Sequence, residues 1–243
     1  MQSFTSRSDT IHTIIKSANL TKTLFLSSII IGDEHIGKKG LARMLLPSAV
    51  YVSANNQEEV EAVLSQHNEV IIGNFEKLSN HSRLNFDNKR IIATANYINN
   101  PNIIDELFSF IYKMPSLKER PEDVSFLAET YIAEAQTLLM LTQENIPLKE
   151  IPYRLDKNTK DLKKSIYMHL LKKNLGKEDI ISLMHDYLYS NMEGNNNYKE
   201  HLELYEKPLI QAGLKKYTSQ LKLSEVLGIN RNTLRKKIHE QGI

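Results

Sequence analysis

The segment TLFLSSIIIGDEHIGKKGLARMLL, residues 23–46, contains the pattern that decides the fold of the first half of this chain. Its apolar run LFLSSIII has eight residues, which is far shorter than a membrane span and is typical of a buried strand. A loop containing glycines follows this run, and residues with helical spacing follow the loop. The order of strand, loop and helix predicts the first unit of a parallel α/β sheet.

The loop GDEHIGKKG, residues 32–40, fits the GxxxxGK spacing of a phosphate-binding loop. Gly32 and Gly37 would let backbone N–H groups surround phosphates, and Lys38 would meet their charge. Lys39 stands where such loops place a magnesium-binding Ser or Thr. Two interpretations follow, a nucleotide-binding loop made by these four residues or a relict turn that only connects strand to helix. Because the magnesium ligand is missing, the relict turn is favoured.

Strands and helices continue to alternate after this loop. AVYVSA, EVIIGNF and KRIIATAN are typical of strands, and NQEEVEAVLSQH is typical of a helix. We therefore predict an α/β domain over residues 1–120. Beyond it the spacing is helical, which predicts a helical subdomain over residues 121–190. A polar, Gly/Asn-rich linker is expected at residues 191–197, and a last domain at residues 198–243.

The net charge of +2 is unevenly distributed along the chain. Residues 214–243 contain seven Lys/Arg and two Glu, a balance of +5, so the remainder carries −3. Such asymmetry is typical of a basic tail domain that contacts a polyanion. The chain has no cysteine, which excludes disulfides and thiolate metal sites, and its histidines lack metal-ligand spacing. No secretory signal or membrane span is visible, so we expect a cytoplasmic protein.

The segment LKLSEVLGINRNTLRKKI, residues 221–238, predicts two short helices joined by a turn. Gly228 can adopt a positive φ and end the first helix. Asn230 is a good N-cap for the second helix. Ile229 and Leu234 occupy the two positions of a hydrophobic staple. An apolar face of the first helix is expected from Leu223, Val226 and Leu227.

The outer side of the second helix collects residues suited to DNA. Asn and Arg side chains can read base edges, whereas Thr and Lys suit phosphate oxygens. We therefore predict that this helix enters a major groove, the alternative being an ordinary basic surface helix. The candidate DNA-binding residues are Asn230, Arg231, Asn232, Thr233, Arg235, Lys236 and Lys237.

The segment YKEHLELYEKPLIQAGLKKY lies upstream of these helices and has an apolar face. Pro208 is expected to kink it or to begin a new helix. A two-fold homodimer would bury this face and present two reading helices to a near-palindromic site. The alternative is that the face packs against the N-terminal domain of the same chain. The apolar residues are Leu202, Tyr205, Leu209, Ile210 and Leu214.

Residues 206–242 closely resemble the Fis-type helix-turn-helix that ends many bacterial regulators, most specifically through LGINRNTLRKKI. This resemblance implies that Asn230 and Arg231 reach bases and that the module forms dimers. It also implies that four residues hold the DNA backbone, namely Thr233, Arg235, Lys236 and Lys237. The segment YTSQLKLSEVLG departs from the pattern, because Leu223 and Ser224 replace a pair of alanines.

The first half resembles the AAA+ domain of sigma-54-dependent activators, the NtrC family. IIIGDEHIGKKGLAR is similar to the family's GESGTGKE-x-x-AR, KRIIATAN to RIIAATN with Asn96 at the sensor position, and MPSLKERPEDV to PPLRERKEDI. DKNTKDLKKSI is similar to GNVRELENVI. The resemblance implies a truncated P-loop AAA+-like parallel sheet, a helical middle segment and an all-α Fis-type helix-turn-helix.

Several functional elements of that family are missing. No GAFTGA loop is present, and Gly73, Asn74 and Phe75 stand where the acidic pair would close a strand. Lys160 matches the sensor arginine, and DELFSFIYK contains no arginine to complete a neighbouring site. Because phosphoryl transfer needs metal and charge stabilisation, we predict that the chain is not an enzyme and has no catalytic or metal-binding residues. No cofactor is expected, although ATP binding is left open.

These observations predict a homodimeric regulator of transcription that binds double-stranded DNA and is associated with the nucleoid. RNA polymerase is a further candidate partner, and no membrane contact is expected. Two other hypotheses remain. The chain is either a nucleoid-associated architectural protein that bends DNA, or a nucleotide-responsive switch in which ATP at Lys38 alters DNA affinity.

Overall fold

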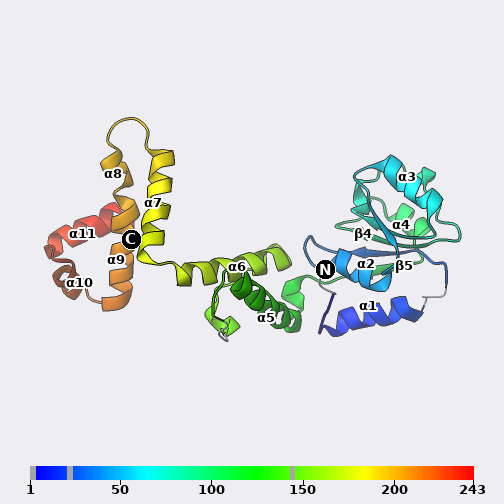
Figure 1. The fold of residues 1–243 in the computed structure, drawn as a ribbon, viewed down its shortest axis with the longest axis horizontal. Helices are drawn as coiled ribbons and strands as arrows, with labels where there is room; N and C mark the ends of the chain where they lie inside the picture. Colours follow the sequence, from blue (N-terminus) through cyan, green and yellow to red (C-terminus); the bar gives the residue numbers. More distant parts are fainter. Residues whose placement is uncertain (1–3, 21–23, 143–145) are drawn as a thin grey trace. The chain divides into compact units, whose positions relative to one another are not determined.

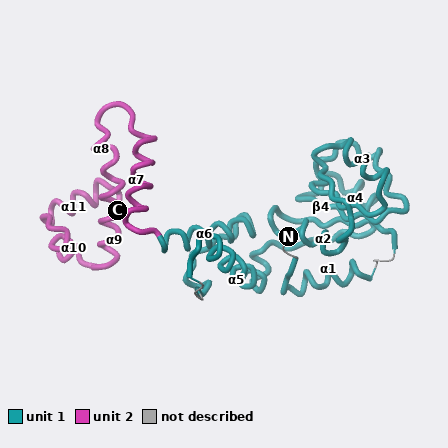
Figure 2. The backbone as a smooth tube through the Cα atoms, viewed as in Figure 1, with its two compact units in different colours: residues 1–174 teal, residues 175–243 magenta. Residues whose placement is uncertain are grey.

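The computed structural model describes residues 4–20, 24–142 and 146–243. Its contacts divide the chain into two compact units, residues 1–174 and residues 175–243, which Figure 2 colours separately. Each unit contains its own cluster of buried apolar side chains. Among the described residues, no helix is both long enough and apolar enough to cross a bilayer.

The first unit is built on a five-stranded sheet in the order β2-β3-β4-β1-β5. Figure 1 labels β4 and β5 of this sheet. Every neighbouring pair is parallel. This confirms the predicted α/β class. The strands are β1 (Ser28–Ile31), β2 (Val50–Ser53), β3 (Glu69–Gly73), β4 (Arg90–Ala95) and β5 (Phe110–Lys113).

Helices cover both faces of this sheet, because successive strand residues point to opposite sides. Ile30 packs on the side of α1 and α2, whereas Ile29 and Ile31 pack on the other side with α3 and α4. Burying each such side chain contributes about 1.5–3 kcal/mol. The helices are α1 (Asp9–Leu20), α2 (Lys38–Leu45), α3 (Gln57–Gln66) and α4 (Pro101–Leu107).

Two parts of the sheet differ from the sequence expectation. The apolar run at residues 24–31 forms a strand only over β1, and Leu24 and Phe25 are more than half exposed. Polar Ser27 and Ser28 separate these two residues from the isoleucines that fill the core. Helix α4 and strand β5 were not predicted from the sequence. The helix is short and the strand is a half-exposed edge strand, so the hydrophobic periodicity of both segments is weak.

A helical segment completes the first unit. Its helices α5 (Pro121–Leu138) and α6 (Asn158–Asn174) pack through a third apolar cluster that includes Ile132 and Ile166. Pro121 occupies the first turn of α5, where its missing N–H costs no helical hydrogen bond. Short 3-10 turns connect elements of this unit at Phe75–Lys77, His81–Arg83, Leu117–Glu119 and Leu148–Glu150.

The second unit is entirely helical. Ile210, Leu223 and Leu234 are its most deeply buried apolar residues. Helix α9 continues through Pro208, and the interruption between α8 and α9 lies upstream, at Leu202. The helices are α7 (Lys177–Asn191), α8 (Asn197–His201), α9 (Glu203–Tyr217), α10 (Gln220–Leu227) and α11 (Arg231–Glu240).

The boundary between the units differs from the expected linker at residues 191–197. Helix α7 is grouped with the C-terminal helices, not with α5 and α6. The ring of Tyr187 in α7 meets the ring of His201 edge-on, with centroids 6.3 Å apart. The polar stretch between α7 and α8 therefore lies within the second unit, and the chain passes between units at residues 174–175.

Candidate nucleic-acid interface and phosphate-loop site

The turn between α10 and α11 has the geometry that its residues predict. Gly228 adopts φ 66° and ends α10, and the Asn230 side chain accepts a hydrogen bond from the Asn232 N–H at 2.8 Å. Leu234 is fully buried, and Ile229 is half-buried beside the same cluster. These contacts orient α11 by its apolar side and leave its polar side to solvent.

Close packing of α9 on α10 supports this turn. A side chain at Gly213 would clash with Leu223, so the two helices approach at a glycine. Ser224 is buried next to Leu223, as expected for a small residue at a crossing. Val226 departs from the expected apolar face, because it lies 53% exposed while Leu227 remains half-buried.

The exposed side of α11 carries most of the predicted DNA-binding residues. Arg231 and Arg235 are four positions apart and share one face, and Asn232 and Lys236 share the adjacent face. The ammonium of Lys236 lies 3.6 Å from the Glu240 carboxylate in an exposed pair. The exposed residues are Asn230, Arg231, Asn232, Thr233, Arg235 and Lys236.

Lys237 is placed differently from its neighbours. Its ammonium donates to the Glu206 carboxylate of α9, and both side chains are largely covered. The predicted phosphate contact of Lys237 therefore competes with an ion pair inside the unit. Asn230 also has a second task, because its side-chain oxygen caps α11.

The apolar face upstream of the turn is divided by the fold. Ile210 is buried and Leu214 is half-buried in the core of the second unit itself. Tyr205 and Leu209 of the same segment remain exposed. Helix α7 adds an apolar surface that the sequence analysis did not single out, with Ile180, Ile181, Leu183 and Tyr187 each at least half exposed.

In the first unit, the glycine loop joins β1 to α2 at the carboxyl end of the sheet, where ligands of open α/β sheets bind. Gly37 adopts φ 102°, and α2 begins at Lys38. The Lys38 ammonium donates to the carbonyl oxygens of Gly32 and Asp33, both at 2.5 Å, and to Asn96 Oδ1 at 2.8 Å. An ammonium has three donors, so all of them have acceptors inside the protein. Burial lowers the pKa of Lys38, and the Glu76 carboxylate opposes this shift.

Glu76 is a residue of this site that the sequence analysis missed. One carboxylate oxygen accepts from Asn96 Nδ2 at 2.7 Å, and the other accepts from the Asn96 backbone N–H at 3.2 Å. A chain of hydrogen bonds thus runs from Lys38 through Asn96 to Glu76. The sequence does contain a signal for Glu76, because an acidic residue lies three positions after the end of β3. It directly follows Gly73, Asn74 and Phe75, which stand where the NtrC family has its acidic pair.

The end of β3 is occupied by an aromatic ring. A side chain at Gly73 would clash with the Tyr51 hydroxyl, so the glycine makes room for this tyrosine. The Lys39 ammonium lies 3.6 Å from the centre of the Tyr51 ring, a cation–π contact. Lys39 therefore faces an aromatic ring at the position where phosphate loops hold magnesium.

Residues far along the chain hold the loop from its other side. The side chains of Asn158, Thr159 and Arg120 donate to the successive carbonyl oxygens of residues 34, 35 and 36, at 3.0, 2.6 and 3.0 Å. Phe4 packs against the loop at Gly37 and Gly40. The loop conformation is thus determined by the helical segment and the N-terminal residues together.

The matched sensor position Lys160 does not line the hollow beside the glycine loop. That hollow of about 410 Å³ is lined by Thr159, Lys38 and Asn96, among others, whereas Lys160 lines a groove elsewhere on α6. Among the described residues, no group of three or more His, Asp or Glu side chains is arranged to hold a metal ion.

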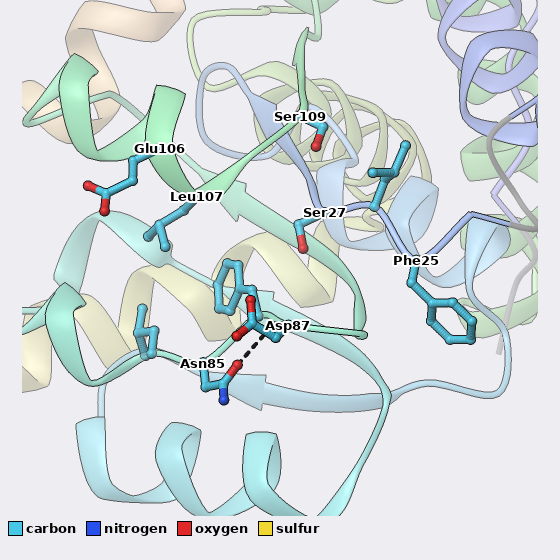
Figure 3. Close-up of a pocket in the computed structure, with 10 residues that line it drawn as sticks. Phe25, Ser27, Asn85, Asp87, Glu106, Leu107 and Ser109 are labelled. Atoms are coloured by element: carbon cyan, nitrogen blue, oxygen red, sulfur yellow. Dashed lines mark hydrogen bonds between the residues drawn. The ribbon is translucent and has the colours of Figure 1, made fainter.

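A further hollow of about 390 Å³ lies at the opposite end of the sheet, shown in Figure 3. Ser27, Asp87 and Ser109 line it just before β1, β4 and β5, and Phe25 stands at its edge. The Asp87 N–H donates to Asn85 Oδ1 at 2.8 Å. Because this is the amino end of the strands, it lacks the loop and helix termini that bind phosphates.

The comparisons with known proteins agree with this geometry. Residues 201–240 match the family described as bacterial regulatory protein, Fis family. In fold the chain is similar to NtrX from Brucella abortus, solved in complex with ATP and in complex with ADP. Both structures are 14% identical, with a TM-score of 0.56 over 99% of this chain and 70% of that chain. No curated protein matches the chain by sequence.

The class of protein follows from these observations. The first unit has a parallel α/β sheet in a fold similar to that of NtrX, and the helix-turn-helix that follows it lies within the residues that match the Fis family, in the order that the sequence predicted. A Fis-type helix-turn-helix is the module of a DNA-binding regulator.

Proposed function

We propose that this chain regulates transcription by binding preferred DNA sequences as a homodimer, without ATPase activity. The observation that carries the proposal is α11, which turns its two arginines, Asn232 and Lys236 outward from the buried Leu234. This helix lies within the residues that match the Fis family. A basic helix exposed in this manner is suited to entering a major groove.

In the major groove, different residues of α11 would contact base edges and phosphate oxygens. Arg231 and Asn232, in the first turn, are the side chains suited to hydrogen bonds with base edges. Arg235, Lys236 and Thr233 are suited to phosphate oxygens. Asn230 contributes as the cap that positions the first turn, in addition to any contact of its own.

A second copy of the chain is the partner that best fits the exposed apolar surface of the C-terminal unit. Leu183 and Tyr187 of α7 are four positions apart, and Tyr205 and Leu209 of α9 are also four apart and exposed. Two helices from each copy could bury these side chains in a two-fold interface. Such a dimer would present two copies of α11 to a palindromic site.

The proposed loss of ATPase activity rests on the contacts of the glycine loop. Lys38 is saturated by internal acceptors, Tyr51 fills the space beside Gly73, and Lys39 faces its ring. Phosphoryl transfer needs a metal ion and free cations at this place. The loop then serves as a structural turn, and the domain as a scaffold.

Because the sequence contains no GAFTGA element, the proposed function does not include activation of sigma-54. Regulation would instead act by occluding a promoter or by contacting the ordinary RNA polymerase. The protein would then be associated with the nucleoid, where its DNA sites lie.

The proposal is tested by footprinting the full chain on genomic fragments, beside the Arg231→Ala/Arg235→Ala variant. A few strongly protected sites that the variant loses are expected. Even coating of all fragments would instead support the architectural DNA-bending alternative. Protection that the variant retains in full would exclude α11 as the reading helix.

ATP binding is a second candidate function, because a hollow lies beside the glycine loop and the similar fold of NtrX was solved with ATP. In this hypothesis the nucleotide displaces Asn96 from Lys38 and alters DNA affinity. Calorimetric titration of the full chain with ATP tests it. The absence of heat at high protein concentration removes it, and so does heat that persists in a folded Lys38→Ala variant.

A further inference from the structure

One face of α6 lines a groove of about 640 Å³ in the first unit. The residues of this face recur every three or four positions, from Lys157 through Lys160 and Lys164 to Lys172. The opposite face, which includes Leu162 and Ile166, is buried against α5. Helical spacing therefore gathers the lysines into one stripe and turns that stripe outward.

The charge in this groove is predominantly positive and largely unpaired. Arg154 and four lysines line it, against the two carboxylates of Asp156 and Asp161. Asp156 is engaged by Arg154 at 2.8 Å and by Lys118 at 3.2 Å. Asp161 accepts from the Lys157 backbone N–H at 3.0 Å. Both carboxylates thus already have partners.

The lysines of the stripe have no carboxylate partner of their own. Within residues 4–20, 24–142 and 146–243, Lys160, Lys164 and Lys172 form no ion pair. Lys163, which belongs to the neighbouring face of α6, is paired with Glu134 at 2.7 Å. The positive charge of these lysines is therefore not balanced inside the protein, and the stripe can attract an external anion.

The dimensions and lining of the groove favour duplex DNA over other polyanions. A stripe from residue 157 to residue 172 is about 22 Å long, which corresponds to roughly six base pairs. Among the described residues, no Phe or Tyr side chain lines the groove, and His169 supplies its one aromatic ring, so it offers little platform for the successive unstacked bases of a single strand. Lysines on flexible stems suit phosphate oxygens without reading sequence.

We propose that this basic groove, formed by Arg154, Lys157, Lys160, Lys164 and Lys172, is a second DNA-binding surface. It binds the phosphate backbone of duplex DNA independently of sequence. This inference rests on the proposed function in one respect, namely that DNA is the polyanion that the chain binds. The groove adds affinity and salt dependence, while α11 supplies preference.

The experiment compares the full-length Lys160→Glu/Lys164→Glu variant with the full-length Lys16→Glu/Lys113→Glu variant. The control changes the net charge equally at exposed lysines away from the groove. Affinity for a long random-sequence duplex is measured over a range of salt concentrations. Because each lost phosphate contact removes about 0.9 from the salt slope, the groove variant should lose about two units of slope and roughly tenfold in affinity. The control should match the unmodified chain.

Further arms separate this proposal from the function of α11. A Lys160→Gln/Lys164→Gln variant repeats the test without adding negative charge, and circular dichroism verifies folding. Groove variants that behave like the control overturn the groove proposal and leave α11 untouched. A loss confined to single-stranded nucleic acid also overturns it. An Arg231→Ala/Lys236→Ala variant that keeps its sequence preference refutes the proposed function, whereas the groove result stands independently.

Discussion

Lys237 of α11 is paired with Glu206 of α9, 31 positions earlier in the chain. This ion pair links α11, the proposed recognition helix, to α9. Lys236, the adjacent residue, projects into solvent. Two neighbouring lysines of the same helix therefore have different surroundings, and we expect them to have different functions.

We predict that Lys236→Ala lowers the salt slope of DNA binding by about one, because it removes a phosphate contact. Lys237→Ala should leave that slope unchanged and destabilise the C-terminal unit by roughly 1–3 kcal/mol, since Glu206 loses its partner in a largely covered position. Binding titrations over a range of salt, with urea denaturation, measure both quantities. A slope that falls equally in the two variants would restore Lys237 to the phosphate-binding set.

We predict that Arg231→Ala relaxes sequence preference and weakens binding to a preferred site by about 1–3 kcal/mol. The reason is that an exposed arginine in the first turn of α11 can reach base edges. Competition between a footprinted site and random duplex measures the change. Equal losses on both duplexes would contradict the base-reading role.

We predict that Leu183→Asp converts a dimer to a monomer. A carboxylate at this exposed position of α7 would be buried without a partner in the proposed interface, which is strongly unfavourable. Light scattering of the full chain measures the mass, with Lys177→Asp in the same helix as control. A monomeric unmodified chain, or a dimeric Leu183→Asp variant, would exclude this interface.

We predict that Lys38→Ala lowers the free energy of unfolding by roughly 1–3 kcal/mol in the absence of nucleotide. Its removal would leave two partly buried carbonyls and the Asn96 side chain without their donor. Lys39→Ala, which loses one exposed cation–π contact, should cost less than about 1 kcal/mol. Urea denaturation compares the two variants. Equal stability of the Lys38→Ala and unmodified chains would show that the ammonium has no structural role.

Much of this architecture could be predicted from local sequence patterns. Gly228, Asn230 and Leu234 lie within seven residues of one another, and each acts through backbone conformation or helical spacing. Strands β1, β3 and β4 could be predicted because each is a short apolar run bounded by polar or glycine residues. Strand β5 could not, since an edge strand alternates weakly and its residues resemble the end of a helix.

The sequence indicated which residues belong to the candidate sites more often than it indicated what each residue does there. The exposed side of α11 follows from helical periodicity, so Arg231 and Lys236 lie where the sequence indicates. The role of Lys237 depends on a carboxylate in another helix, which no local pattern contains. Likewise, the four-residue glycine-loop motif is present, but its lysine is held by Asn96 and, through it, by Glu76.

The sequence by itself determined the order of the elements, the basic C-terminal module and the identity of its exposed residues, because these depend on spacing within a few residues of the chain. Only the tertiary structure decided which charges are free. Asn96 holds the ammonium of Lys38 and Glu206 pairs with Lys237, and both partners are distant in sequence, whereas the lysine stripe of α6 forms no ion pair among the described residues. The physical reason is that pairing depends on which side chains the fold brings within hydrogen-bonding distance, and that distance is set by packing.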